Sequence, residues 1–171
     1  ARVLSVAAEG RDRHRVVLDR TAFYPESGGQ PADRGELGEA RIVDVREAGE
    51  EIVHVITGTP PRAGGVVEGR VDLERRRDLA CQHTAQHIVS AVAVERFGAR
   101  TARARIDEKR AVLELEIDPL DDGRLRELER LANRVVEDDL PIRSEIADDA
   151  DNESFRGARP ARPDEPLRLV D

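Results

Sequence analysis

The feature that most constrains the fold is a change in sequence character near Asp72. From Leu73 to Phe97 there is no Gly and no Pro, and apolar residues recur at intervals of three and four. This is the spacing of one helical face. The pattern predicts a helix over 73–97 that stops at Gly98. Its expected apolar face comprises Leu79, Ala80, His83, His87, Ile88, Ala91, Val92 and Val94.

The residues before Asp72 form short β-rich runs without a helical period. Each run is bounded by Gly, Pro, Asp or Asn, which are the usual turn residues. Short strands at such regular spacing predict a small β-barrel or a sandwich. The expected strands cover residues 15–19, 40–45, 52–56 and 66–71.

The residues after Gly98 predict a hairpin. Segments 101–106 and 111–117 alternate with period two around the polar turn 107–110, which is typical of two antiparallel strands with one solvated face. The solvated face is expected to carry Thr101, Arg103 and Arg105.

A second helix is expected after the hairpin. It has Asp121 or Asp122 as its N-cap and ends before Pro141. Residues 148–166 are rich in Asp, Arg and Pro and predict an exposed loop, and residues 167–170 resemble the start of a further strand. The expected apolar stripe of the helix is Leu125, Leu128, Leu131, Ala132, Val135 and Val136.

Composition excludes some functional classes. The 171 residues carry 28 Lys and Arg against 36 Asp and Glu, a net charge of −8. This disfavours tight nonspecific binding to a phosphate backbone, although a local arginine surface is compatible with it. No apolar stretch is long enough to span a bilayer and no signal peptide is evident, so an intracellular, non-membrane protein is expected. A single cysteine allows no internal disulfide.

The first motif with chemical potential is His83-Thr84-Ala85-Gln86-His87. Histidines four apart lie one helical turn apart, so both imidazoles can reach one zinc ion. The alternative is two polar residues at the edge of a buried helix face. Thr84 stands where a metalloprotease needs a Glu as general base, which disfavours that class. Cys81 projects from another side of the helix and is expected to be a small buried side chain.

The second motif is the glycine-rich stretch from Thr21 to Gly35. Gly28 and Gly29 allow positive φ or a close approach of the backbone to a phosphate or ribose. A tight turn between strands is the alternative explanation. Arginines such as Arg76 and Arg77 suit bidentate phosphate contacts, but a solvated surface explains them equally well.

Taken together, these motifs resemble the alanyl-tRNA editing proteins of the free-standing AlaX type, which are related to the editing domain of alanyl-tRNA synthetase. The resemblance rests on Thr21–Gln30 with Asp33 and Gly35, followed by Arg76 or Arg77 shortly before the histidine motif. It continues through segments 97–101, 131–136 and 167–170.

The resemblance implies an α+β fold with two parts. Residues 1–72 would form a β-barrel like those of translation factors, and residues 73–171 a two-layer α/β editing domain with a zinc-binding helix. It also implies ATP-independent hydrolysis, in the cytoplasm, of the ester that joins serine, and possibly glycine, to tRNA specific for alanine. No oligomeric state is implied.

The resemblance assigns roles to individual residues. His83 and His87 match the first two zinc ligands, and the remaining ligands are expected beyond Asp171, where we expect the sequence to be trimmed. Loss of those ligands, with poor zinc binding, is the alternative. Residues expected to face the tRNA acceptor end are Gly28, Gly29, Gln30, Arg76 and Arg77. Thr84, Gln86 and Thr101 are candidates for the substrate pocket, although related synthetase domains have Thr where Gln86 stands.

Two other functions stay open at the level of sequence. A noncatalytic tRNA-binding or adaptor module would explain a histidine pair without further ligands. An unrelated zinc-dependent hydrolase of small esters or amides would draw on the histidine pair alone, and it lacks an identifiable base.

Overall fold

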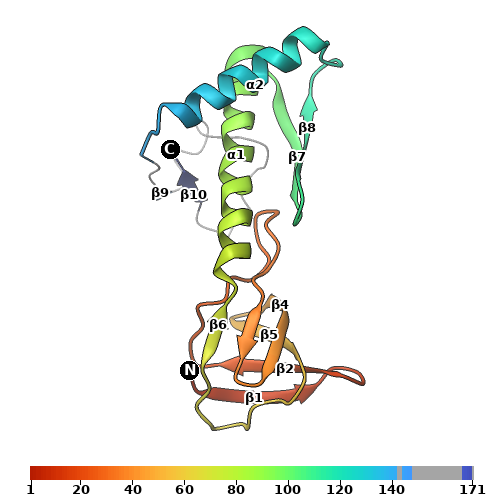
Figure 1. The fold of residues 1–171 in the computed structure, drawn as a ribbon, viewed down its shortest axis with the longest axis vertical. Helices are drawn as coiled ribbons and strands as arrows, with labels where there is room; N and C mark the ends of the chain where they lie inside the picture. The colour runs from red at the N-terminus through yellow and green to blue at the C-terminus, as the bar shows by residue number, and fades with distance from the viewer. Residues whose placement is uncertain (142–143, 148–166, 171) are drawn as a thin grey trace. The chain divides into compact units, whose positions relative to one another are not determined.

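The computed structural model describes residues 1–141, 144–147 and 167–170, so the loop expected over 148–166 lies outside the described residues. The chain divides into two compact units: Ala1–His83 with Ile106–Arg110, and Thr84–Arg105 with Ala111–Asp171. One continuous helix, α1 (Leu73–Phe97), contributes to both (Figure 1). The proposed domain boundary between residues 72 and 73 stays a prediction.

The first unit is built on a six-stranded antiparallel sheet with the order β1-β2-β5-β4-β3-β6 (Figure 1). Four of its strands overlap the predicted β-rich runs, although β6 takes up only the last three residues of the predicted run 66–71. Strands β1 and β3 carry no strong signal. The strands are β1 (Val3–Ala8), β2 (Arg13–Leu18), β3 (Gly35–Leu37), β4 (Ala40–Ala48), β5 (Glu51–Thr57) and β6 (Gly69–Val71).

The structure does not show the expected closed barrel. Within the described residues, the edge strands β1 and β6 share no ladder. A single bridge between Arg2 and Val66 joins the start of β1 to the segment before β6, and the amide of Val3 donates to the Gly65 carbonyl at 2.9 Å. The expected α and β content is confirmed as antiparallel sheets and two described helices.

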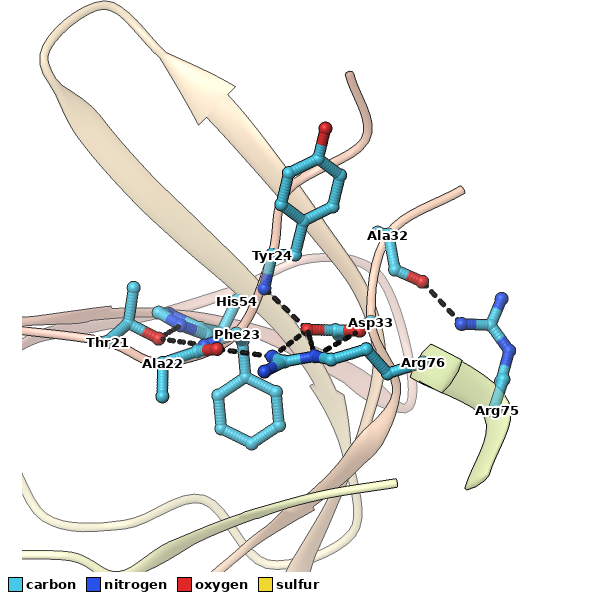
Figure 2. A network of polar contacts seen from close by, with 9 residues as sticks. All are labelled: Thr21, Ala22, Phe23, Tyr24, Ala32, Asp33, His54, Arg75 and Arg76. Carbon is cyan, nitrogen blue, oxygen red and sulfur yellow. Dashed lines mark hydrogen bonds and ion pairs between the residues drawn. The ribbon is translucent and has the colours of Figure 1, made fainter. Parts of the chain in front are cut away.

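A buried histidine lies in the core of the first unit. His54 on β5 is fully buried, and its ring meets Phe23 edge-on at 5.7 Å (Figure 2). Its Nδ1–H donates to the Val16 carbonyl at 3.1 Å, so Nε2 accepts from the Thr21 hydroxyl at 2.7 Å. The Thr21 oxygen accepts in turn from the Phe23 amide. Through its bonds to Thr21 and Val16, the neutral ring therefore connects the start of the glycine-rich segment to the sheet.

We expect the stability of the chain to depend on pH through His54. Burial lowers the pKa of His54 below its ordinary value of 6.5, and the bond to Val16 opposes this only in part. The unfolded state therefore binds the extra proton first, and stability is lost as pH falls below about 6.5, by at most about 1.4 kcal/mol per pH unit. Urea unfolding of the wild type and His54→Gln between pH 8 and 5 should show a shallower acid loss in the variant. Equal slopes would contradict this assignment.

The hairpin and the second helix form as predicted. Both belong to the second unit, except for the hairpin tip Ile106–Arg110, which belongs to the first. β7 (Arg100–Ile106) pairs with β8 (Ala111–Glu116), and β9 (Ser144–Ala147) pairs antiparallel with β10 (Leu167–Val170). Helix α2 (Asp122–Glu137) begins at the N-cap Asp121, whose carboxylate accepts from the Arg124 amide at 2.8 Å. The core of the second unit is formed by Val92, Ala93, Ala99 and Leu128, flanked by partly buried residues such as Phe97, Leu115 and Leu131.

Helix α1 has the predicted bounds, and Gly98 follows it with a φ of 64°. The predicted faces are partly wrong. Leu79 and Val92 are both buried, but at 100° per residue they lie roughly 140° apart around the helix, so no single apolar stripe runs its length. Five residues expected on the apolar face of α1 or expected to be buried there are exposed: Ala80, Cys81, His87, Ala91 and Val94.

Two further expectations about burial are corrected. Leu125 and Val136 are exposed at the ends of the α2 stripe, while Leu128 and Ala132 between them are buried. Thr101, expected on the solvated face of the hairpin, is 2% exposed because its hydroxyl bonds to a buried serine of α1.

No helix among the described residues is long and apolar enough to cross a membrane.

Candidate functional site

The glycine-rich motif folds into a tight turn, as one of the two sequence interpretations predicted. The Ser27 amide donates to the Gln30 carbonyl at 3.2 Å, and the Gln30 amide donates to the Ser27 carbonyl at 2.9 Å. Between them, Gly28 and Gly29 have φ values of 59° and 82°. A two-residue turn with positive φ at both central positions favours glycine at each.

This turn lies against the first histidine of the helical motif. His83 Nδ1 is 3.0 Å from Gln30 Oε1. An amide oxygen only accepts, so Nδ1 carries the proton and donates it. A Cβ added to Gly28 would lie 3.5 Å from His83 Cε1, which places the turn backbone beside the ring. The two motifs therefore meet within the first unit.

A buried carboxylate fixes the loop that carries the turn. Asp33 is 1% exposed, and its Oδ2 accepts from the Tyr24 amide at 2.7 Å and from Arg76 Nε at 3.0 Å (Figure 2). Arg76 Nη2 contacts the same carboxylate and donates to the Ala22 carbonyl at 2.5 Å. The Asp33 amide donates back to the Tyr24 carbonyl. One aspartate thus joins both arms of the loop to the first turn of α1.

Arg75 makes a second attachment beside the first. Its Nη1 donates to the Ala32 carbonyl at 2.6 Å (Figure 2). Its Nε lies 3.3 Å from Glu108 at the hairpin tip. The Asp72 carboxylate caps the helix by accepting from the Arg75 amide. The tip reaches the turn as well, since the Ile106 amide donates to the Gly29 carbonyl at 3.2 Å.

The remaining residues predicted to bind tRNA or metal are placed as follows. Arg77 is exposed, whereas the Arg76 guanidinium is engaged by Asp33 and Ala22. His87 is one turn beyond His83 on α1, and its residue surface is exposed. Nearby protein atoms nevertheless remove water from the ring and lower the pKa of His87. Contacts of these residues with tRNA or zinc stay predictions.

Two of the three candidate pocket residues meet in the second unit. Thr101 donates to the Ser90 hydroxyl at 2.8 Å, and the Gln86 amide nitrogen donates to the same oxygen at 3.3 Å. All three side chains are buried. Thr84 is half-buried. Sequence reasoning missed Ser90, although it stands three residues after His87 and seven after His83, on the same side of the helix.

The described residues include no group of three or more His, Cys, Asp or Glu side chains placed to hold one metal ion. The metal ligands predicted from the sequence are the imidazoles of His83 and His87 on α1. Their chemistry suits zinc, which favours nitrogen ligands at helical i, i+4 spacing.

We expect the ion pair between Asp33 and Arg76 to be worth more than a surface pair, because breaking it leaves a buried carboxylate uncompensated. Arg76 is one-third exposed, so Arg76→Met should lower the free energy of unfolding by about 2–3 kcal/mol. The matched change Arg77→Met, at an exposed position, should cost less than about 0.5 kcal/mol. Urea unfolding followed by circular dichroism measures both; equal effects would show that the pair does not fix the loop.

Comparison with known proteins agrees with these motifs. A family model described as tRNA synthetases class II (A) matches residues 3–75. Alanine–tRNA ligase of Pyrobaculum neutrophilum is 42% identical over 153 residues, which is 85% of this chain and 17% of that protein. Alanine–tRNA ligase of Halorubrum lacusprofundi is 42% identical over 157 residues, 87% of this chain and 16% of the ligase.

A shorter relative aligns over more of the chain. Alanyl-tRNA editing protein Aarsd1 of Bos taurus is 37% identical over 161 residues, 91% of this chain and 36% of that protein. The chain spans under a fifth of the length of the ligases and just over a third of the editing protein. It is therefore a sequence relative of the alanine–tRNA ligases and the alanyl-tRNA editing proteins, as its two motifs indicated.

Proposed function

We propose that the chain is the editing part of a cytoplasmic hydrolase that removes serine, and also glycine, from tRNA specific for alanine. The reaction is hydrolysis of the ester between the amino acid and the terminal ribose, and it needs no ATP. The names of the relatives, alanine–tRNA ligase and alanyl-tRNA editing protein, support this substrate class.

The observation that carries the proposal is the contact between Gln30 and His83. It joins the glycine-rich turn to the histidine motif, two segments more than 50 residues apart in the chain. Each motif alone has an ordinary structural explanation. A hydrolytic site for a nucleic-acid end must hold that end close to the hydrolytic group. The contact of the two motifs at one imidazole meets this requirement.

The donor set of α1 fits a zinc ion in part. His83 and His87 would supply two imidazole nitrogens, and the full-length protein would have to supply the further ligands. When bound, zinc supplies a Lewis acid and a polarised water beside the ester. The proton of His83 on Nδ1 leaves the lone pair on Nε2, the arrangement that metal-ligating histidines adopt when the other ring nitrogen donates to an oxygen.

The chain's own residues would receive the acceptor end. The turn at Gly28 and Gly29 presents backbone without side chains, so a ribose or phosphate can approach closely. The exposed Arg77 provides a guanidinium for a phosphate contact. The buried hydroxyls of Thr101 and Ser90 and the amide of Gln86 are polar groups with which a seryl hydroxyl can exchange hydrogen bonds.

The test is hydrolysis of aminoacylated tRNA specific for alanine by the full-length protein that contains this chain, with zinc present. We expect release of serine and glycine to be much faster than release of alanine. His83→Ala should lower the rate constant roughly 100-fold or more, because the metal's several kcal/mol of transition-state stabilisation would be lost.

The control is His14→Ala, which removes a half-buried histidine of β2 and should keep the wild-type rate. Binding of the tRNA without hydrolysis would sink the enzymatic proposal in favour of an adaptor module. Hydrolysis that survives His83→Ala unchanged would contradict the assigned site.

A further inference from the structure

We propose that Gln30 is a positioning residue that holds the His83 imidazole with its proton on Nδ1 and thereby presents Nε2 as the ligand nitrogen. The tautomer follows from this chain's own contacts, whereas the role of Nε2 as a metal ligand rests on the proposed function. The juxtaposition that carries the inference is the 3.0 Å contact between Gln30 Oε1 and His83 Nδ1.

The Gln30 side chain is held in place by its backbone. Both hydrogen bonds of the two-residue turn run between Ser27 and Gln30, so the backbone of Gln30 is fixed on either side of its Cα. The residue is 8% exposed, which keeps water from competing for Oε1. The buried Asp33 carboxylate then anchors the loop three residues further on.

The turn restricts the ring as well as the proton. Gly28 lies beside the imidazole, with its virtual Cβ 3.5 Å from Cε1 and 3.9 Å from Nε2. A ring flipped about its Cβ–Cγ bond would place a carbon in place of Nδ1 against Gln30 Oε1 and would lose the hydrogen bond. The contact therefore selects one ring orientation and one tautomer together.

A glutamine oxygen differs from the carboxylate often found in this role. It accepts the Nδ1 proton without adding a negative charge, so the imidazole is orientated while it stays neutral. A neutral imidazole with an orientated lone pair is the form in which histidine binds a metal ion.

The first readout needs neither metal nor tRNA. Long-range ¹H–¹⁵N correlation spectra of the metal-free full-length protein, at a pH where the imidazoles are neutral, report which nitrogen of His83 carries the proton. We expect Nδ1–H in the wild type and in Gln30→Glu, which keeps an acceptor oxygen. Gln30→Met keeps the length but removes the acceptor, and should shift His83 toward Nε2–H.

The second readout is the affinity for zinc alone, measured by competition with a chelating dye. Gln30→Met should bind zinc about 10- to 100-fold more weakly than the wild type. The control is Gln82→Met, which removes another amide of the same helix, one whose buried Oε1 makes no hydrogen bond among the described residues. This variant should keep both the tautomer and the affinity.

The outcomes separate this inference from the proposed function. A wild-type His83 with Nε2–H, or a Gln30→Met variant with unchanged tautomer, overturns the positioning role even if the protein hydrolyses seryl-tRNA. An Nδ1–H tautomer that depends on Gln30 supports it even if no hydrolysis is found. Should Gln30→Met fail to fold, loss of Nδ1–H in Gln30→Glu would overturn it and retention would support it.

Discussion

The buried carboxylate of Asp33 is the constraint on which the candidate site depends. A charge with 1% exposure is tolerated only when its oxygens are satisfied, and here a backbone amide and a guanidinium satisfy them. The partners come from both arms of the loop and from helix α1, so the carboxylate is satisfied only if all three segments are in place. The position of the glycine-rich turn, and hence of Gln30 beside His83, follows from this requirement.

The same geometry gives two of the predicted surface arginines a structural role. Net charge argues against a broad basic surface, and the motif arginines suggested a local one. Arg75 and Arg76 are instead engaged by carbonyls and carboxylates of the loop, where the planar fork of a guanidinium serves better than an ammonium group. Fewer guanidinium groups are then available for the tRNA contacts that we propose, and Arg77 is the exposed one of the three neighbouring arginines.

Much of the fold could be predicted from local sequence. Helix α1, the hairpin of β7 and β8, and the N-cap at Asp121 each have a signal within a few residues, and all three are confirmed. Strand β3 was missed because Gly35–Leu37 is too short to show alternation, whereas β1 (Val3–Ala8) is longer but carries no strong β-rich signal. The faces of α1 were partly wrong because its apolar positions serve two units and do not share one stripe.

The candidate site was predicted in its parts but not in its connections. The glycine turn and the histidine pair each carry a recognisable spacing. The contact of Gln30 with His83, the pairing of Asp33 with Arg76 and the burial of His54 all join residues 33 or more apart in sequence. Such pairings depend on tertiary structure, and local periodicity in a single sequence carries no signal for them.

The glycine-rich turn, through Gln30, orientates His83 of helix α1 for zinc binding in the account given above. A double-mutant cycle on zinc affinity tests this coupling most directly. The cycle compares the full-length wild type with Gln30→Met, His83→Ala and the double variant. If Gln30 acts through His83, the glutamine change should have no further effect once the histidine is gone. An equal loss of affinity in both backgrounds would contradict the account.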